Sequence, residues 1–354
     1  MRRGLMAWNP EELPLDILRE RLRRLQGAMA AAGHDAMILY TNFIRSAAVS
    51  YLTGFSPYWA DGVVLVPREG EPVFATTLSK RVGQWIQSVK PIGEVVCSPT
   101  PGAVLGKHLA GNEAIRRVAI LELDAFPSGL YDELAAALPN AEFVDGSEAF
   151  AAARSHLDSA ERCLLARAKN IAQEALESLD ESSAGDVGNA VGQVEKIARL
   201  QGAEEAYVAI APDLESGRRF VRLSGNRRLG RIFAIRATVA YKGSWLRQTK
   251  TYAADEKARG RIEHADAWFE AFVSRIDVSR PLRDQIAAAL ADIRDAEIAG
   301  FIAEAPIGTR PLAALGATQT LENMPALVVT LGLNVGGTPW CGAALAGLFH
   351  GKAA

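Results

Sequence analysis

The spacing of apolar residues divides the chain into segments expected to be helices and segments expected to be strands. Residues 15–32 place apolar side chains at helical spacing among Arg and Glu, and Gly33 follows where a left-handed residue would end the helix. Short apolar runs typical of strands occur at residues 36–40, 62–67, 72–76, 118–123 and 141–144. Helices and strands in this order predict one α/β domain with a mixed sheet in residues 1–150.

The helical period is stronger in the second half. Residues 155–179 keep a 3.6-residue spacing over about seven turns without Gly or Pro. Residues 231–252 alternate as a β-hairpin would, and residues 326–333 form the last clear strand. Further helices are expected at residues 187–200, 258–276 and 282–298. Residues 151–354 therefore predict an α+β domain whose helices cover one face of a mostly antiparallel sheet.

Length and composition narrow the function classes. At about 150 residues per domain, 354 residues also give two domains. The net charge of -2 and the 49% hydrophobic content favour neither nucleic acid, nor a membrane surface, nor disorder. Three separated cysteines without a CxxC pair, and an N-terminus unlike a signal peptide, predict a cytoplasmic protein.

Two segments carry a resemblance to a known family. Residues 51–55 (YLTGF) and 230–252 (GRIFAIRATVAYKGSWLRQTKTY) together resemble the creatinase, prolidase and aminopeptidase P group, the M24 peptidase family. The helix that begins near Ser155 is similar to the helix that joins the two domains of that family. The resemblance covers nearly the whole chain. It implies a creatinase N-terminal-like α/β domain (1–150), a "pita-bread" α+β domain (151–354) and a homodimer.

The metal ligands that this resemblance implies are replaced. Active metallopeptidases of the family hold two divalent metals with two Asp eleven residues apart, a His and two Glu. Aligned without a gap, the two Asp positions are Arg236 and Arg247. The His is expected within residues 301–308, which contain none, the first Glu at Thr330 or Leu331, and the second near Leu348. We therefore expect no metal, no cofactor and no metallopeptidase activity.

Creatinase, which resembles this fold and works without metal, uses a His before the hairpin. No His lies between His156 and His264, and the expected position falls at Arg218 or Arg219. Both routes known for the family are thus interrupted by arginine.

The basic residues suggest a binding pocket. Arginine offers a planar fork that suits a carboxylate or a phosphate. The set that could converge is Arg218, Arg219, Arg222, Arg236, Arg247 and Lys250. We expect it to bind an anionic small molecule, such as an amino acid, a peptide-like carboxylate or a phosphate ester. The alternative is that the arginines face solvent or pair with internal acids, namely Glu204, Glu205, Asp255 or Glu304.

Other side chains are weaker candidates. Trp245 could stack on a ligand or belong to the core. Tyr58 and Trp59 lie where the resemblance implies a lid over the site of a partner subunit. The catalytic candidates are Glu304, Tyr241 and Cys341, the last of which could equally be a buried inert thiol.

Three functions follow. The first is a metal-independent enzyme that acts on a C–N bond of a small anionic, amino-acid-like substrate. The second is an inactive pseudo-peptidase that serves as a ligand-binding or scaffold protein. The third, a metal-dependent Xaa-Pro peptidase, requires ligands that the sequence lacks.

Overall fold

The computed structural model describes residues 8–42, 44–55, 61–89, 93–110, 115–179, 185–316, 321 and 324–348. The chain divides into two compact units. An N-terminal unit contains residues 2–160 with 308–310, and a C-terminal unit contains residues 161–307 with 311–354. None of the helices within the described ranges is long and apolar enough to cross a membrane.

The N-terminal unit is built on a six-stranded mixed sheet, in the order β4-β3-β2-β1-β5-β6. β2 pairs antiparallel with both β1 and β3, whereas β1 with β5, β3 with β4, and β5 with β6 pair parallel. The strands are β1 (Ala36–Thr41), β2 (Gly62–Pro67), β3 (Val73–Thr76), β4 (Glu94–Cys97), β5 (Arg117–Ile120) and β6 (Glu142–Asp145).

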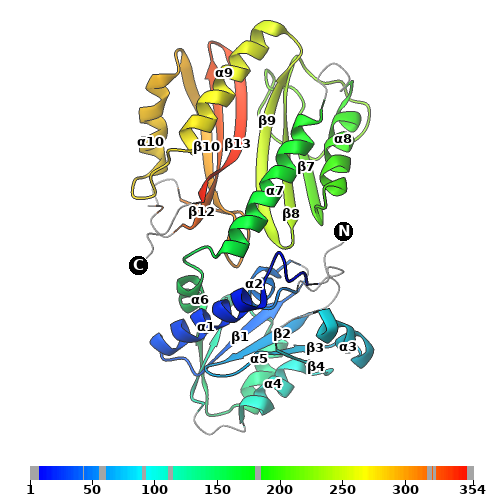
Figure 1. The fold of residues 1–354 in the computed structure, drawn as a ribbon, viewed down its shortest axis with the longest axis vertical. Helices are drawn as coiled ribbons and strands as arrows, with labels where there is room; N and C mark the ends of the chain where they lie inside the picture. The colour runs from blue at the N-terminus through cyan, green and yellow to red at the C-terminus, as the bar shows by residue number, and fades with distance from the viewer. Residues whose placement is uncertain are drawn as a thin grey trace. The chain divides into compact units, whose positions relative to one another are not determined.

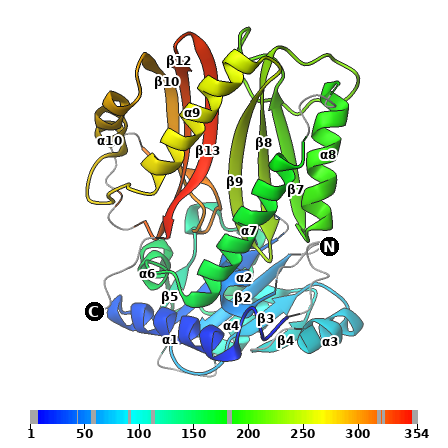
Figure 2. The same cartoon turned by 45° about the horizontal axis from the view of Figure 1, so that its top comes forward.

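Helices cover both faces of this sheet (Figure 2). One apolar cluster joins the sheet to α1 (Leu15–Ala31), α2 (Ala47–Thr53), α3 (Lys80–Val89) and α6 (Ser147–Ala153). A second joins the other face to α4 (Pro101–Ala110) and α5 (Ser128–Ala137). A single 3₁₀ turn, Leu123–Ala125, follows β5. Gly33, with φ 72°, follows α1 in the left-handed conformation that the sequence predicts.

The YLTGF segment has a structural role in this unit. Its first three residues end α2, and Gly54 caps the helix with φ 66°. The Tyr51 ring lies 4.6 Å from the guanidinium carbons of both Arg21 and Arg154. Arg21 is buried, donates to the Tyr51 carbonyl at 2.8 Å and forms a two-pronged ion pair with Asp158. The segment therefore ties α1 and α2 together.

The C-terminal unit is built on a seven-stranded sheet, in the order β11-β10-β12-β13-β9-β8-β7. All of its neighbouring strands run antiparallel. The strands are β7 (Glu205–Ala211), β8 (Ile232–Tyr241), β9 (Ser244–Ala253), β10 (Ala296–Ala305), β11 (Ala313–Ala314), β12 (Ala326–Val335) and β13 (Thr338–Leu348). The hairpin expected at residues 231–252 is confirmed by β8 and β9.

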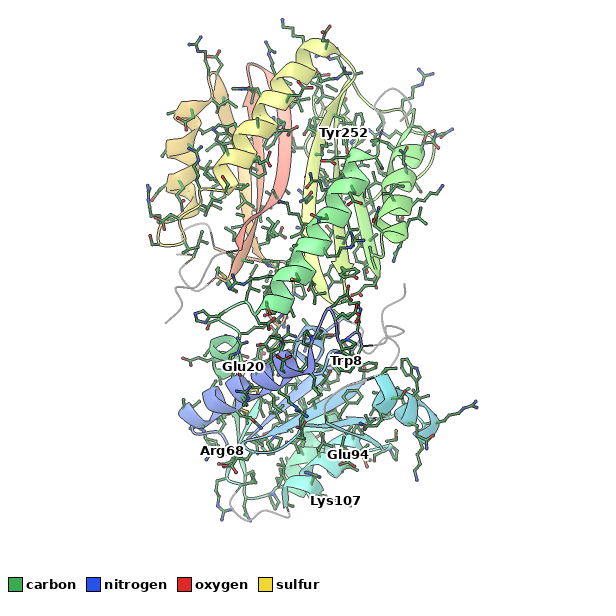
Figure 3. All side chains as sticks on the ribbon, viewed as in Figure 1. Trp8, Glu20, Arg68, Glu94, Lys107 and Tyr252 are labelled. Carbon is green, nitrogen blue, oxygen red and sulfur yellow. The ribbon has the colours of Figure 1, made fainter. Side chains whose placement is uncertain are left out.

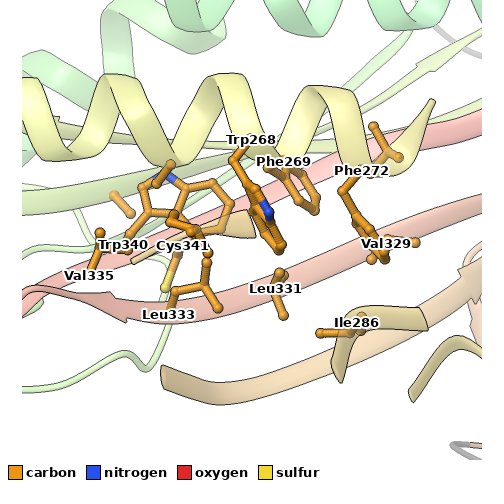
Figure 4. Close-up of a cluster of buried hydrophobic side chains, with 14 of the residues drawn as sticks. Trp268, Phe269, Phe272, Ile286, Val329, Leu331, Leu333, Val335, Trp340 and Cys341 are labelled. Carbon is orange, nitrogen blue, oxygen red and sulfur yellow. The ribbon is translucent and has the colours of Figure 1, made fainter. Parts of the chain in front are cut away.

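The long helices of this unit lie on one face of the sheet (Figure 1). They are α7 (Ser159–Glu177), α8 (Val187–Leu200), α9 (Glu256–Val273) and α10 (Leu282–Ala289), the last followed by a 3₁₀ turn, Leu290–Asp292. Tyr252, labelled in Figure 3, stacks on Phe233 and donates to the Leu176 carbonyl of α7 at 2.8 Å. Under α9, Trp268, Phe269 and Phe272 pack on odd-numbered residues of β12 (Figure 4).

The expected helix at residues 282–298 is wrong in its second half. Helix α10 ends at Ala289, and Ala296 already begins β10. The apolar spacing of this stretch fits a helix, but the backbone of β10 pairs with β12, and this pairing decides the structure.

Candidate functional site

The β8–β9 hairpin places its two arginines on one face of the sheet. Arg236 lies opposite Thr249, and Arg247 lies opposite Thr238. Because side chains alternate along a strand, these residues share one face. The two-residue turn of the hairpin sets this register, with Lys242 and Gly243 at φ 47° and 79°. Helices α7 and α9 pack on the opposite face, so we call this one the helix-free face.

The register extends the helix-free face across the sheet. Thr249 lies opposite Ala343 of β13, and Ala343 lies opposite Thr330 of β12. Thr330 in turn lies opposite Ile302 of β10, two residues before Glu304. Strands that are distant in the sequence thus bring Glu304 toward the arginines.

Arg247 forms an ion pair with Glu304. The Glu304 side chain is 7% exposed and that of Arg247 23% exposed, so the pair is largely shielded from water. Arg247 Nε also donates to the Thr238 hydroxyl at 3.2 Å. The alternative in which an arginine pairs with an internal acid therefore holds for Arg247. Of the other acids considered, Glu204 accepts from the Gly243 amide and Asp255 caps α9.

Arg236 has no carboxylate partner among the described residues. Its guanidinium carbon lies 4.0 Å from the centre of the Phe220 ring, and its Nε donates to Thr249 at 3.3 Å. Burial lowers the pKa of Arg236, and the charge of Arg247 lowers it further, while Glu304 and Cys341 oppose this. Arginine stays protonated under such shifts, so a positive charge is held here without an acid in contact.

Arg218 comes from the loop between β7 and β8 and crosses the same face. One of its Nη atoms bonds to the Asn334 side chain of β12. The other lies over Gly332, where a Cβ would come within 3.3 Å of it. A side chain at position 332 would therefore be tight against this guanidinium.

Three buried polar atoms on this face have no hydrogen-bond partner among the described residues. They are Arg218 Nη1, Glu304 Oε2 and the Thr330 hydroxyl. An unsatisfied buried polar atom costs about 1–3 kcal/mol, and a charged one costs more. Near Arg236, the Arg218 nitrogen can thus donate a hydrogen bond, the Glu304 oxygen can accept one, and the Thr330 hydroxyl can do either. A small molecule that carries both hydrogen-bond acceptors and a donor would match these atoms.

Lys250 does not belong to this set. Because it is one residue removed from Thr249, its side chain points to the opposite face, toward α7 and α9. Arg219 is exposed. Arg222 is also exposed and lies 4.4 Å from the centre of the Tyr207 ring.

The aromatic candidates lie toward the β8–β9 turn. Trp245 stacks on Tyr207, with ring centres 5.8 Å apart and planes 6° apart. Tyr241 is the last residue of β8, with Arg167 5.9 Å and Lys242 6.0 Å from its ring centre. Tyr58 and Trp59 lie outside the described residues.

Cys341 shares the helix-free face, opposite Gly332, and is 5% exposed. Burial raises the pKa of its thiol, and the nearby Arg218 and Arg236 only partly offset this. A protonated thiol is a poor nucleophile, so the geometry fits an inert buried cysteine.

The residues of this face do not fit a pair of metals. Three arginines and one glutamate occupy it, and a dication would add to an existing positive charge. No group of three or more His, Cys, Asp or Glu that could hold a metal occurs within the described part of the chain. Thr330 lies opposite Ala343, whereas Leu348 lies opposite Ala326. The position of β13 that lies beside Thr330, where a residue could bind the same metal ion, is thus Ala343 and not Leu348. Neither Ala343 nor Leu348 is a carboxylate.

The sequence did not single out Phe220 or Asn334. Both contact an arginine, but they come from a loop and a strand that only the fold brings together.

Comparison with known proteins gives one family match. Residues 21–156 match the family described as Creatinase/Prolidase N-terminal domain. No curated protein shows significant sequence similarity to the chain.

Solved structures match over both units. The Xaa-Pro dipeptidase from Bacillus anthracis is 19% identical at a TM-score of 0.70, over 93% of this chain and 94% of the other. The prolidase from Pyrococcus horikoshii OT3 is 16% identical at 0.66, over 92% and 94%. The N-terminal domain of the FACT complex subunit SPT16 from Cicer arietinum is 14% identical at 0.61, over 94% and 93%. The chain therefore has the fold of these proteins.

Proposed function

We propose that this chain, which carries a creatinase/prolidase N-terminal domain and has the prolidase fold, binds a small anionic, amino-acid-like molecule on its helix-free face. In this proposal arginines supply the positive charge that metals supply in metallopeptidases of the fold. The proposal rests on one observation, the three partnerless buried atoms of Arg218, Glu304 and Thr330 beside the unpaired charge of Arg236.

The chemistry of these atoms defines the ligand. Its carboxylate would accept from Arg236 and from the open Nη atom of Arg218. A nitrogen-bound hydrogen of the ligand would meet Glu304 Oε2, and the Thr330 hydroxyl would serve either end. An α-amino acid derivative or a short peptide carries both groups close together.

Turnover at a C–N bond is the enzymatic form of this proposal. Glu304 is the catalytic candidate that it retains, because its second oxygen is buried and free to accept a proton. Hydrolysis would need Glu304 to take a proton from the attacking water and return it to the leaving nitrogen. Tyr241 lies toward the hairpin turn and Cys341 carries a raised pKa, so neither supports such a role.

Binding without turnover is the alternative. The ion pair with Arg247 favours it, because it engages one of the two oxygens of the Glu304 carboxylate. The two forms differ in one measurable outcome, the appearance of a cleaved product.

Isothermal titration calorimetry with glycylglycine, N-acetylglycine and inorganic phosphate tests the proposal. Arg236→Met and Arg218→Met should each weaken binding of the preferred probe by about tenfold to a hundredfold, since a charged hydrogen bond contributes about 1.5–3 kcal/mol. Arg219→Met, at an exposed neighbour of Arg218, is the matched control and should bind as the unmodified protein does. Equal affinity in all four proteins, or no binding of any probe, would overturn the proposal.

We also propose that the protein is a homodimer in the cytoplasm. The resemblance to the family supports the first statement. The three free thiols, Cys97, Cys163 and Cys341, support the second, since they suit a reducing compartment. Analytical ultracentrifugation checks the dimer, and a monomer at micromolar concentration would contradict it.

A further inference from the structure

A cavity lies on the face of the seven-stranded sheet that is opposite the helix-free face. It has a volume of about 260 Å³ and lies between α7 and α9. Figures 1 and 2 both show these helices on one face with β9 and β13 between them. Such a volume is just below the roughly 300–1,000 Å³ typical of drug-sized ligands, so it suits a smaller molecule.

The floor of this cavity presents two polar side chains that form no hydrogen bond or ion pair with the described residues, although the Lys250 ammonium lies 5.6 Å from the centre of the Tyr252 ring. Gln248 and Lys250 of β9 point into it, and Gly342 and Ala344 of β13 also line it, with the Trp340 ring packed over Gly342. Gln248 is only 8% exposed, yet its amide bonds to no described residue. Lys250 forms no ion pair within the described ranges, although its charge reaches Asp266. A buried amide of this kind is normally hydrogen-bonded.

The walls of the cavity carry opposite charges. On the side of α7 and β9, Lys169 joins Lys250, and the one acid there, Glu177, is engaged by Gln173 at 2.8 Å. On the side of α9 stand two acids, Asp266 and Glu270. Trp340 Nε1 donates to Asp266 Oδ1 at 2.8 Å and thereby holds this carboxylate in place.

We propose that the cavity between α7 and α9 is a second binding site, for a zwitterion of the size of an amino acid. The ligand's carboxylate pairs with Lys250 and the Gln248 amide, and its ammonium group faces Asp266 and Glu270. This arrangement satisfies the partnerless floor and matches the charge of each wall.

Isothermal titration calorimetry with leucine as the probe tests this site. N-acetylleucine lacks the ammonium group and leucinamide lacks the carboxylate, so each should bind at least tenfold more weakly than leucine. If leucine does not bind, or if the three compounds bind equally, the inference is wrong.

Variants locate the site. Lys250→Met and Asp266→Asn should each weaken leucine binding at least tenfold, whereas the exposed controls Lys257→Met and Asp284→Asn should not. Thermal unfolding of each variant verifies that it is folded. Lys250→Met in the floor and Asp266→Asn in the wall are independent tests of the site.

Arg236→Met separates this site from the helix-free face. Leucine binding that survives Arg236→Met and fails in Lys250→Met supports the second site. The reverse result would place leucine on the helix-free face and refute this inference, without harm to the proposed function.

Discussion

Single charges decide the chemistry of the helix-free face. Arg236 and Arg247 stand eleven residues apart on adjacent strands, but only Arg247 has a carboxylate partner in the described structure. Arg236 is held by the Phe220 ring and Thr249 instead, and its charge stays available. The β8–β9 hairpin is a candidate anion site because the charge of Arg236, unlike that of Arg247, is not neutralised by a carboxylate in contact with it.

Glu304→Gln tests the ion pair at this scale. The substitution leaves Arg247 without its counter-charge in a shielded place, so the free energy of unfolding should fall by about 1–3 kcal/mol, less than for a fully buried pair. Urea unfolding measures the loss. Glu297→Gln, exposed on the same strand, is the control and should change stability by less than about 0.5 kcal/mol. Equal stability of the two variants would mean that the pair contributes nothing.

The thiols offer a second test at the residue scale. Cys163 is exposed, while Cys341 is buried and its pKa is raised by that burial. Iodoacetamide should therefore alkylate Cys163 in the folded protein and reach Cys341 only after unfolding, as peptide mass spectrometry would show. Faster modification of Cys341 than of Cys163 would contradict this expectation and support Cys341 as a nucleophile.

At the scale of elements, strand alternation sorts the basic residues. The sequence pattern predicts the β8–β9 hairpin, and the register then puts Arg236 and Arg247 together. The same alternation sends Lys250 to the other face, which the idea of one converging basic cluster overlooked. A prediction of which side chains meet needs the period of the strand as well as its existence.

Two strands could not be recognised from their residues. Strand β10 reads AEIAGFIAEA and β13 reads TPWCGAALAGL, both rich in Ala and Gly, which have low strand propensity. Pairing with β12 on both sides imposes the extended conformation. The sequence therefore suggests Glu304 and Thr330 only as isolated positions, and their common face follows from tertiary pairing.

Asp266 connects α9 to β13 and gives a pH-dependent test at this scale. Burial raises its pKa from 3.8 to about 6, although the bond from Trp340 and the charge of Lys250 oppose this, and Glu263 and Glu270 add to it. The folded state therefore binds a proton more tightly than the unfolded state. The stabilisation that the folded state gains from protonated Asp266 is complete below about pH 4 and is lost as the pH rises through about 6.

Urea unfolding from pH 4 to pH 7 measures this contribution. The unmodified protein should lose on the order of 2 kcal/mol relative to Asp266→Asn across this range, because asparagine does not titrate. Asp284→Asn, on the exposed side of α10, supplies the baseline. A difference between the proteins that stays constant with pH would contradict the assignment.

At the scale of the whole molecule, the chain has the fold of the prolidases, and three arginines lie on the helix-free face of its seven-stranded sheet. The match to the prolidases extends over both units, whereas the positions at which the resemblance implies metal ligands include Arg236, Arg247 and Thr330. Fold alone does not specify function, and the side chains of the site do.

Thermal unfolding tests whether the stability of the protein is independent of divalent metal ions. Addition of Mn²⁺, or removal of divalent ions with EDTA, should leave the melting temperature unchanged, because a ligand stabilises only the protein that binds it. A rise of several degrees with Mn²⁺ that EDTA reverses would contradict the poor fit of this face to metals.

The central claim is that arginines, not metals, hold a small anion on the helix-free face. Native mass spectrometry of the purified protein with glycylglycine, N-acetylglycine and phosphate, with elemental analysis of the same sample, tests it most directly. The account predicts one bound anion per chain, no stoichiometric metal, and loss of the anion in an Arg236→Met/Arg218→Met variant. Two bound metals per chain, or anion binding that the double variant retains, would contradict it.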